Sequence, residues 1–270
     1  MNKFNFKDGY LKYFRLAWEN ILYPGKFKID FIVVGAQKAG TTSLDKYLRE
    51  QPKIVMPKWK EICYFDNDIA FKTKRLPNLR GFYKIKNRLK IYGECTPCYI
   101  YWDTAIKRIR EHNPEAKIVA ILRNPVTRAF SQWNMEVWRN AETRSFRTCI
   151  EEEIREINEG TKQQHRVKSY VHRGMYVEQI NRIYSLFPEE QVLFIKYEDF
   201  LENQLSVLNH IFSFVGGKPF KAIPVRKTAN KREYSAKITK EEKKILIDFF
   251  EPTTKEVEKI LSWDCNDWKK

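Results

Sequence analysis

The sequence of 270 residues predicts a single α/β domain with a mostly parallel central sheet flanked by helices. Short apolar runs rich in β-branched residues alternate with stretches whose apolar residues recur at helical spacing. A glycine-containing loop follows the first apolar run and leads into a helix. No repeat or Pro/Gly-rich linker divides the chain, so residues 29–270 are interpreted as one domain, preceded by an amphipathic helical extension at residues 1–28.

The first strand is expected at residues 30–34, where DFIVV is typical of a buried strand. A loop at 35–40 and a helix at 41–50 follow it, and the run KIVAIL predicts a second strand at 117–122. The remaining predicted elements are a helix after the Asn124–Pro125 turn, helices at 146–158 and 177–187, a strand at 192–195, a helix around 200–214, and helices that begin near 239 and 252. Strands that alternate with helices place a ligand at the carboxyl ends of the strands.

The composition is globular, with 43% hydrophobic residues, but the net charge of +16 is unusually high. Self-repulsion of this size favours an anionic ligand such as nucleic acid, a phosphate-bearing cofactor, an acidic polymer or a membrane surface. Solubility alone is the alternative explanation. Residues 10–22 alternate basic and aromatic side chains, which suits either contact with a membrane surface or packing against the domain.

Five cysteines do not make a disulfide framework, and a reducing, cytoplasmic location is expected. Cys95 and Cys98 form a C-x-x-C pair with Pro97 inside it, and no second pair completes a zinc site. Buried small hydrophobes are the alternative to a redox pair. No apolar run reaches the roughly 20 residues that span a bilayer, so no transmembrane segment is expected.

The segment from Gly35 to Thr42 nearly fits the Walker A pattern, but Thr41 replaces the lysine after the second glycine. The lysine lies inside the loop, at Lys38. Backbone N–H groups and the helix N-terminus would still hold an anion, whereas the missing lysine argues against nucleoside triphosphate hydrolysis. A simple glycine turn is the structural alternative. The expected anion-binding residues are Gln37, Lys38, Ala39, Gly40, Thr41, Thr42 and Ser43.

A second motif, Ile121 to Ser131 (ILRNPVTRAFS), places Arg123 at a strand tip and Ser131 two helical turns on. Arg123 can offer paired hydrogen bonds to a phosphate, although it could instead pair with a carboxylate. Together the two motifs resemble the 5'-phosphosulfate loop and the 3'-phosphate site of sulfotransferases that use 3'-phosphoadenosine-5'-phosphosulfate (PAPS). The resemblance is to the branch of bacterial and heparan-sulfate-type carbohydrate enzymes, and it implies their P-loop-like fold.

PAPS carries a 5'-phosphosulfate and a separate 3'-phosphate, which matches two anion sites. No convincing Walker B aspartate follows a strand; the nearest imitation, Tyr197–Asp199, resembles a structural motif of the family. No metal is expected, because lysine, arginine and backbone N–H groups can neutralise the charge. Near the C-terminus the segment Asn230–Tyr234 resembles the loop that closes over the nucleotide, and it assigns Arg232, with Lys231 beside it, to cofactor binding.

The segment Lys58–Asp66 resembles the family stretch whose glutamate is the proposed base, which assigns that role to Glu61 and an acceptor contact to Asp66. The neighbouring Tyr64 and Phe65 are expected to lower the local polarity and raise the pKa of Glu61. The alternative interpretation of Glu61 is an ordinary surface glutamate, and His172 is the rival candidate for the base. Glu94, in a stretch that resembles the family's acceptor motif, is assigned to substrate binding; Cys95 replaces the lysine of the heparan-type enzymes and puts a heparan-like acceptor in doubt.

The resemblance therefore implies in-line transfer of a sulfuryl group from PAPS to a hydroxyl, or an amine, of a carbohydrate. PAP (3'-phosphoadenosine-5'-phosphate) is the expected product. A small alcohol, phenol or lipid acceptor is the alternative within the family, and no nucleic-acid partner is expected. A P-loop kinase or NTPase, and a basic module that binds nucleic acid or an anionic membrane without catalysis, are the more distant alternatives.

Overall fold

The computed structural model describes residues 27–84, 90–224 and 236–269. Most of the predicted extension at 1–28 therefore lies outside the described residues. The strands are β1 (Phe31–Gly35), β2 (Ile54–Val55), β3 (Ile91–Cys95), β4 (Lys117–Leu122) and β5 (Val192–Lys196). The α-helices are α2 (Thr41–Glu50), α3 (Asp68–Lys72), α4 (Ala105–His112), α5 (Pro125–Trp138), α6 (Phe146–Asn158), α7 (Tyr176–Tyr184), α8 (Tyr197–Glu202), α9 (Gln204–Val215) and α10 (Lys240–Leu261).

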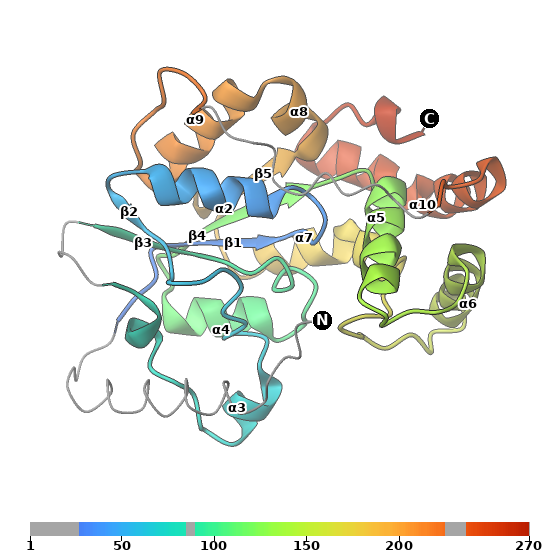
Figure 1. The fold of residues 1–270 in the computed structure, drawn as a ribbon, viewed down its shortest axis with the longest axis horizontal. Coiled ribbons are helices and arrows are strands. Elements are labelled where there is room, and N and C mark those ends of the chain that lie inside the picture. The colour runs from blue at the N-terminus through green and yellow to red at the C-terminus, as the bar shows by residue number, and fades with distance from the viewer. Residues whose placement is uncertain (1–26, 85–89, 225–235, 270) are drawn as a thin grey trace.

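The five strands form one sheet in the order β2-β3-β1-β4-β5, and every pair is parallel. Helices α2, α8 and α9 lie on one side of the sheet and α4 and α7 on the other (Figure 1). This confirms the predicted α/β class. Because both faces are covered, the central strands β1 and β4 read as nearly continuous apolar runs.

Helices α5, α6 and α10 gather beyond the right-hand end of the sheet in Figure 1, around a second, smaller apolar cluster. Phe130, Ile150 and Phe250 contribute to it, one from each helix. All three helices begin at a side-chain cap, which is Asn124 in α5, Ser145 in α6 and Thr239 in α10. Asn124 accepts the N–H groups of Val126 and Thr127, with Pro125 at the first helical position. The cap of α5 fixes the direction in which the helix leaves the tip of β4.

The helix expected around 200–214 is two helices, because α8 ends at Glu202 and α9 begins at Gln204. The two helices expected to begin near 239 and 252 are instead one, α10, which runs through Pro252. Proline removes one backbone hydrogen bond and costs a helix about 3 kcal/mol. The helix tolerates this because Pro252 is on its exposed side while Leu246, Phe250 and Val257 are buried on the other.

Strand β3 was not expected from the sequence, because IYGEC has neither strict alternation nor a continuous apolar run. Its glycine has a packing role that only the fold reveals. Gly93 pairs with Phe31 of β1, and a Cβ at this position would sit 2.1 Å from Cζ of the Phe31 ring. Because Gly93 has no side chain, the ring of Phe31 can cross β3. The segment that follows β3 is thereby placed beside the end of β1.

Candidate active site

The loop between β1 and α2 has the features of an anion site. The backbone of Lys38 is left-handed, with φ 71°, and so is that of Gly40, with φ 82°. Helix α2 has no side-chain cap at its N-terminus and no acidic residue in its first turn. Its first N–H groups and the positive end of its dipole are thus available to an external anion.

Two neighbours hold this loop in place. The Arg123 guanidinium, at the tip of β4, donates from Nη1 to the carbonyl oxygen of Lys38 at 2.9 Å. A Cβ on Gly40 would lie 2.9 Å from Cε2 of Tyr197, so the ring of Tyr197 packs directly against the loop. Within the rest of the predicted loop, Ala39 and Thr41 are buried, Thr42 and Ser43 are exposed, and Gln37 has a buried Oε1 without a partner in the described part of the chain.

The ammonium group of Lys38 lies 3.7 Å from Sδ of Met135 on α5. Burial lowers the pKa of Lys38, and the positive charges of Arg123 and Arg139 lower it further, whereas Glu136 opposes them. A cluster of three cations balanced by the single carboxylate of Glu136 favours a bound anion, which would restore the charge balance. Met135 and Glu136 were not expected at this site from the sequence.

A helical count from Ser131 would have found Met135. It follows Ser131 by four residues, so the two share one face of α5. Glu136 is only 2% exposed, and Arg139 donates to its Oε1 at 3.2 Å. The burial of Glu136 cannot be inferred from spacing alone, because it depends on how α5 packs against the rest of the domain.

Arg123 and Ser131, the predicted 3'-phosphate residues, lie on the tip of β4 and the following helix. The Arg123 guanidinium donates from Nε to Oγ1 of Thr127 at 3.0 Å and stacks 4.9 Å over the ring of Tyr197. Arg123 makes no ion pair with a carboxylate of the described residues. The alternative interpretation, in which this arginine pairs with a carboxylate instead of a phosphate, therefore finds no support. Ser131 is buried, with 4% exposure.

The segment that carries Glu61 is anchored by the residues that follow β3. Thr96 Oγ1 accepts the N–H of Cys63 at 3.4 Å, and the hydroxyl of Tyr99 accepts the N–H of Tyr64 at 2.9 Å. The backbone of Glu61 is left-handed, with φ 61°, a conformation that persists only where surrounding contacts hold it. Its side chain is about half exposed and pairs with Lys60 Nζ at 2.8 Å.

Asp66 and Glu94, the predicted acceptor contacts, have no exposed surface. Asp66 Oδ2 pairs with Arg166 Nη1 at 2.6 Å, and Glu94 Oε1 accepts the hydroxyl of Thr96 at 2.5 Å. Burial raises the pKa of Glu94 to about 8. Glu94 thus supports the loop of Glu61 through Thr96, and direct contact of either carboxyl group with an acceptor stays a prediction.

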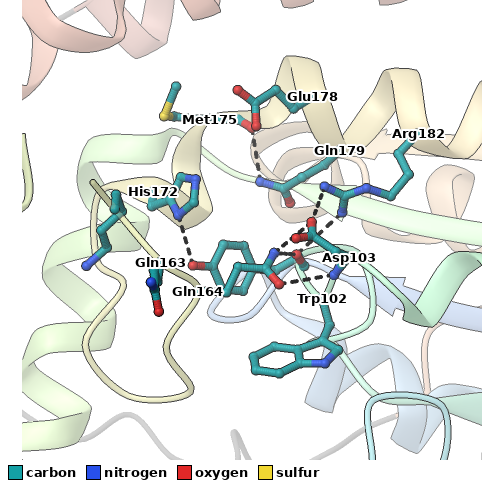
Figure 2. Close-up of a pocket in the computed structure, with 11 residues that line it drawn as sticks. Trp102, Asp103, Gln163, Gln164, His172, Met175, Glu178, Gln179 and Arg182 are labelled. Atoms are coloured by element: carbon teal, nitrogen blue, oxygen red, sulfur yellow. Dashed lines mark hydrogen bonds and ion pairs between the residues drawn. The ribbon is translucent and has the colours of Figure 1, made fainter. Parts of the chain in front are cut away.

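His172, the rival base, lines a pocket whose residues include none from the loop between β1 and α2 (Figure 2). Its Nδ1 lies 3.0 Å from the hydroxyl of Tyr101, and burial lowers its pKa. Lys231 and Arg232 lie outside the described residues. All five cysteines are unpaired, with Cys95 buried and Cys98 partly buried. The described residues hold no group of three or more His, Cys, Asp or Glu side chains arranged for a metal ion.

A family model described as "Sulfotransferase domain" matches residues 28–270. The chain belongs to the sulfotransferase family. The crystal structure of a sulfotransferase from Alicyclobacillus acidocaldarius is similar to this fold, with a TM-score of 0.74 and 27% identity, and the match covers 90% of this chain and all of that one. Fold and enzyme class therefore agree with the prediction from the two anion motifs.

Two curated sulfotransferases also resemble the chain. The membrane-associated sulfotransferase kil1 of Dictyostelium discoideum is 36% identical over 112 residues, which cover 40% of this chain and 23% of that protein. Heparan sulfate glucosamine 3-O-sulfotransferase 6 of the mouse is 27% identical over 201 residues, covering 72% of this chain and 54% of that protein. This sulfotransferase chain thus spans about a quarter to a half of the length of these relatives. Among its described helices, none is both long and apolar enough to cross a membrane.

Proposed function

We propose that this sulfotransferase moves a sulfuryl group from PAPS to a hydroxyl of a carbohydrate acceptor. The observation that carries the proposal is the hydrogen bond from Arg123 to the carbonyl oxygen of Lys38. It ties the Arg123 guanidinium, at the end of β4, to the loop that leads into the uncapped N-terminus of α2. Two cationic sites on adjacent parallel strands are what a nucleotide with a phosphate at each end of its adenosine requires.

The donor-side residues fit PAPS by their chemistry. The uncapped start of α2 and the Lys38 ammonium suit the 5'-phosphosulfate, while Arg123 and Ser131 suit the 3'-phosphate. Because Arg123 uses Nε and Nη1 within the protein, its Nη2 group remains to face a phosphate. When bound, PAPS supplies the sulfuryl group, which bonds to the acceptor oxygen as its bond to the 5'-phosphate oxygen breaks.

On the acceptor side, Glu61 would remove the hydroxyl proton as the acceptor oxygen attacks sulfur. Its carboxylate is reachable from solvent and lies on a segment whose backbone is fixed by Thr96 and Tyr99, which are the conditions that a general base needs. Lys38 would stabilise the negative charge that builds on the departing phosphate oxygen. The proposal of a carbohydrate acceptor rests on the similarity to heparan sulfate 3-O-sulfotransferases. A cytoplasmic location stays a prediction.

Turnover of PAPS labelled with ³⁵S against a panel of saccharides, with phenols and simple alcohols as competing acceptor classes, tests this proposal. We expect label on at least one saccharide, and none with Lys38→Ala. Lys46→Ala, which removes a lysine from the middle of α2 outside the predicted loop, is the matched control and should retain activity. Labelling of phenols alone would contradict the carbohydrate acceptor, and transfer that survives Lys38→Ala would contradict the assigned site.

A further inference from the structure

The pocket that His172 lines has hydrogen-bond acceptors without donors. It is a pocket of about 450 Å³, formed by the loop after β3, the segment after α6 and the start of α7 (Figure 2). Its volume falls within the usual range of ligand pockets, about 300–1,000 Å³. Trp102, His172 and Gln179 come from these separate segments and surround the same space.

Gln179 lines the pocket with an amide whose hydrogen bonding is incomplete. The side chain is 3% exposed, and its Nε2 donates to the carbonyl oxygens of Arg173 and Met175, at 3.2 and 3.1 Å. These two bonds fix the amide orientation and leave Oε1 buried without a partner in the described residues. A buried carbonyl oxygen without a donor costs free energy, so a donor from a ligand would be favoured there.

His172 offers a second acceptor to the pocket. The Tyr101 hydroxyl donates to Oγ of Ser169 at 2.9 Å and lies 3.0 Å from Nδ1 of His172. With the tyrosine proton used on Ser169, Nδ1 carries the ring proton and donates to the Tyr101 oxygen. The Nε2 atom is then an acceptor, since burial favours the neutral ring. No described residue provides it with a hydrogen bond.

The cations that line the pocket are already neutralised by the protein. Arg182 pairs with Asp103 at 2.5 Å and also donates to the carbonyl oxygen of Ile100 at 3.3 Å. Lys162 donates to Glu156 at 3.1 Å and to the carbonyl oxygen of Lys168 at 3.0 Å. The pocket therefore has little to offer a sulfate or carboxylate, and its free acceptors call for a ligand with O–H donors.

Trp102 connects this pocket to the side of the molecule that carries Glu61. The indole lines both this pocket and a second one of about 410 Å³, which also includes Cys63, two residues after Glu61. Its Nε1 donates to Asp68 at 2.8 Å, and the guanidinium of Arg166 stacks 4.5 Å over the ring. A rigidly held aromatic ring between two hollows is suited to pack against the apolar face of a sugar ring.

We propose that the pocket of Gln179 and His172 binds an uncharged sugar unit of an oligosaccharide acceptor, beyond Trp102 from the unit that is sulfated. The proposal rests on the proposed carbohydrate sulfotransferase function and makes it more specific: the acceptor is a chain of several sugars with an uncharged unit at a fixed distance from the reacting hydroxyl. The hydroxyls of that unit would donate to Gln179 Oε1 and His172 Nε2.

Calorimetric titration of the full chain, with PAP present to prevent turnover, tests the proposal. The probes are neutral cello-, chito-, malto- and xylo-pentaoses and a heparan sulfate pentasaccharide. We expect at least one neutral pentaose to bind, and Gln179→Leu to weaken it about tenfold, which corresponds to loss of about one hydrogen bond.

Glu178→Ala provides a second variant that does not depend on a buried position, because Glu178 lines the pocket but is exposed. It should weaken the same pentaose about threefold, and Glu189→Ala, at an exposed glutamate outside the pocket, should not. Failure of all neutral pentaoses to bind, or equal binding by wild type, Gln179→Leu and Glu178→Ala, would overturn the proposal. Loss of PAP binding in the wild type would instead refute the sulfotransferase site itself, so the two failures are distinguishable.

Discussion

Replacement of Arg123 by alanine is expected to weaken the binding of PAP by about two orders of magnitude. Arg123 donates to the Lys38 carbonyl oxygen at 2.9 Å and would have Nη2 left for the 3'-phosphate. A hydrogen bond to a charged group contributes about 1.5–3 kcal/mol. Loss of the phosphate contact and of the tether to the loop should together cost about 3 kcal/mol, which is somewhat more than a hundredfold in Kd.

Titration calorimetry of PAP against wild type and variants measures this effect directly. Arg147→Ala is the matched control, because Arg147 is on α6, pairs with Glu151 and belongs to neither anion motif. Arg123→Lys should recover only part of the affinity, since an ammonium cannot reproduce the arginine fork. A Kd for Arg123→Ala within threefold of wild type, with the fold intact, would refute the assignment of Arg123 to the 3'-phosphate.

Three further predictions concern the base, a buried carboxyl group and the loop. Glu61→Gln should lower kcat at least a hundredfold with PAP affinity unchanged; a near-normal kcat would remove Glu61 as the base. Glu94→Gln should match wild type in urea unfolding at pH 5 but be the more stable of the two by pH 8. The pKa of Glu94 is raised to about 8, so between pH 4.5 and 8 the folded wild type holds a proton that the unfolded chain has released. The stability of the wild type therefore falls by up to about 1.4 kcal/mol per pH unit over that range. A difference between the two proteins that does not change with pH would contradict this cause. Gly40→Ala should lower stability by about 1–2 kcal/mol and also lower PAP affinity, because φ is 82° and the ring of Tyr197 is 2.9 Å from the new Cβ. The control is Gly160→Ala, where φ is 68° and the space around the glycine is open; it should cost about 1 kcal/mol of stability and no PAP affinity. Equal PAP affinity in the two variants would contradict the role of the loop.

The elements predicted well from the sequence are those whose signal is local. The run KIVAIL is buried on both sides, so its composition alone identifies β4 at residues 117–122. Helix α6 spans 146–158 as predicted, since its apolar residues recur at helical spacing. In contrast, β3 depends on a glycine that accommodates the ring of Phe31 from the neighbouring strand. That requirement is tertiary and leaves no periodic pattern.

The same division holds at the candidate site. Lys38 and Arg123 could be expected to meet, because residues that follow adjacent parallel strands share one edge of the sheet. The anchoring of the Glu61 segment by Tyr99 and Thr96 required the fold, since 35 residues separate Tyr64 from Tyr99. The burial of Glu136 beside Lys38 depends on how α5 packs and likewise could not be read from spacing.

A crystal structure of the chain with PAP bound tests the central claim most directly. We expect the 5'-phosphate within hydrogen-bonding distance of Lys38 and the first N–H groups of α2, and the 3'-phosphate on Arg123 and Ser131. A nucleotide bound elsewhere on the molecule, or bound with its two ends exchanged between these sites, would contradict the account.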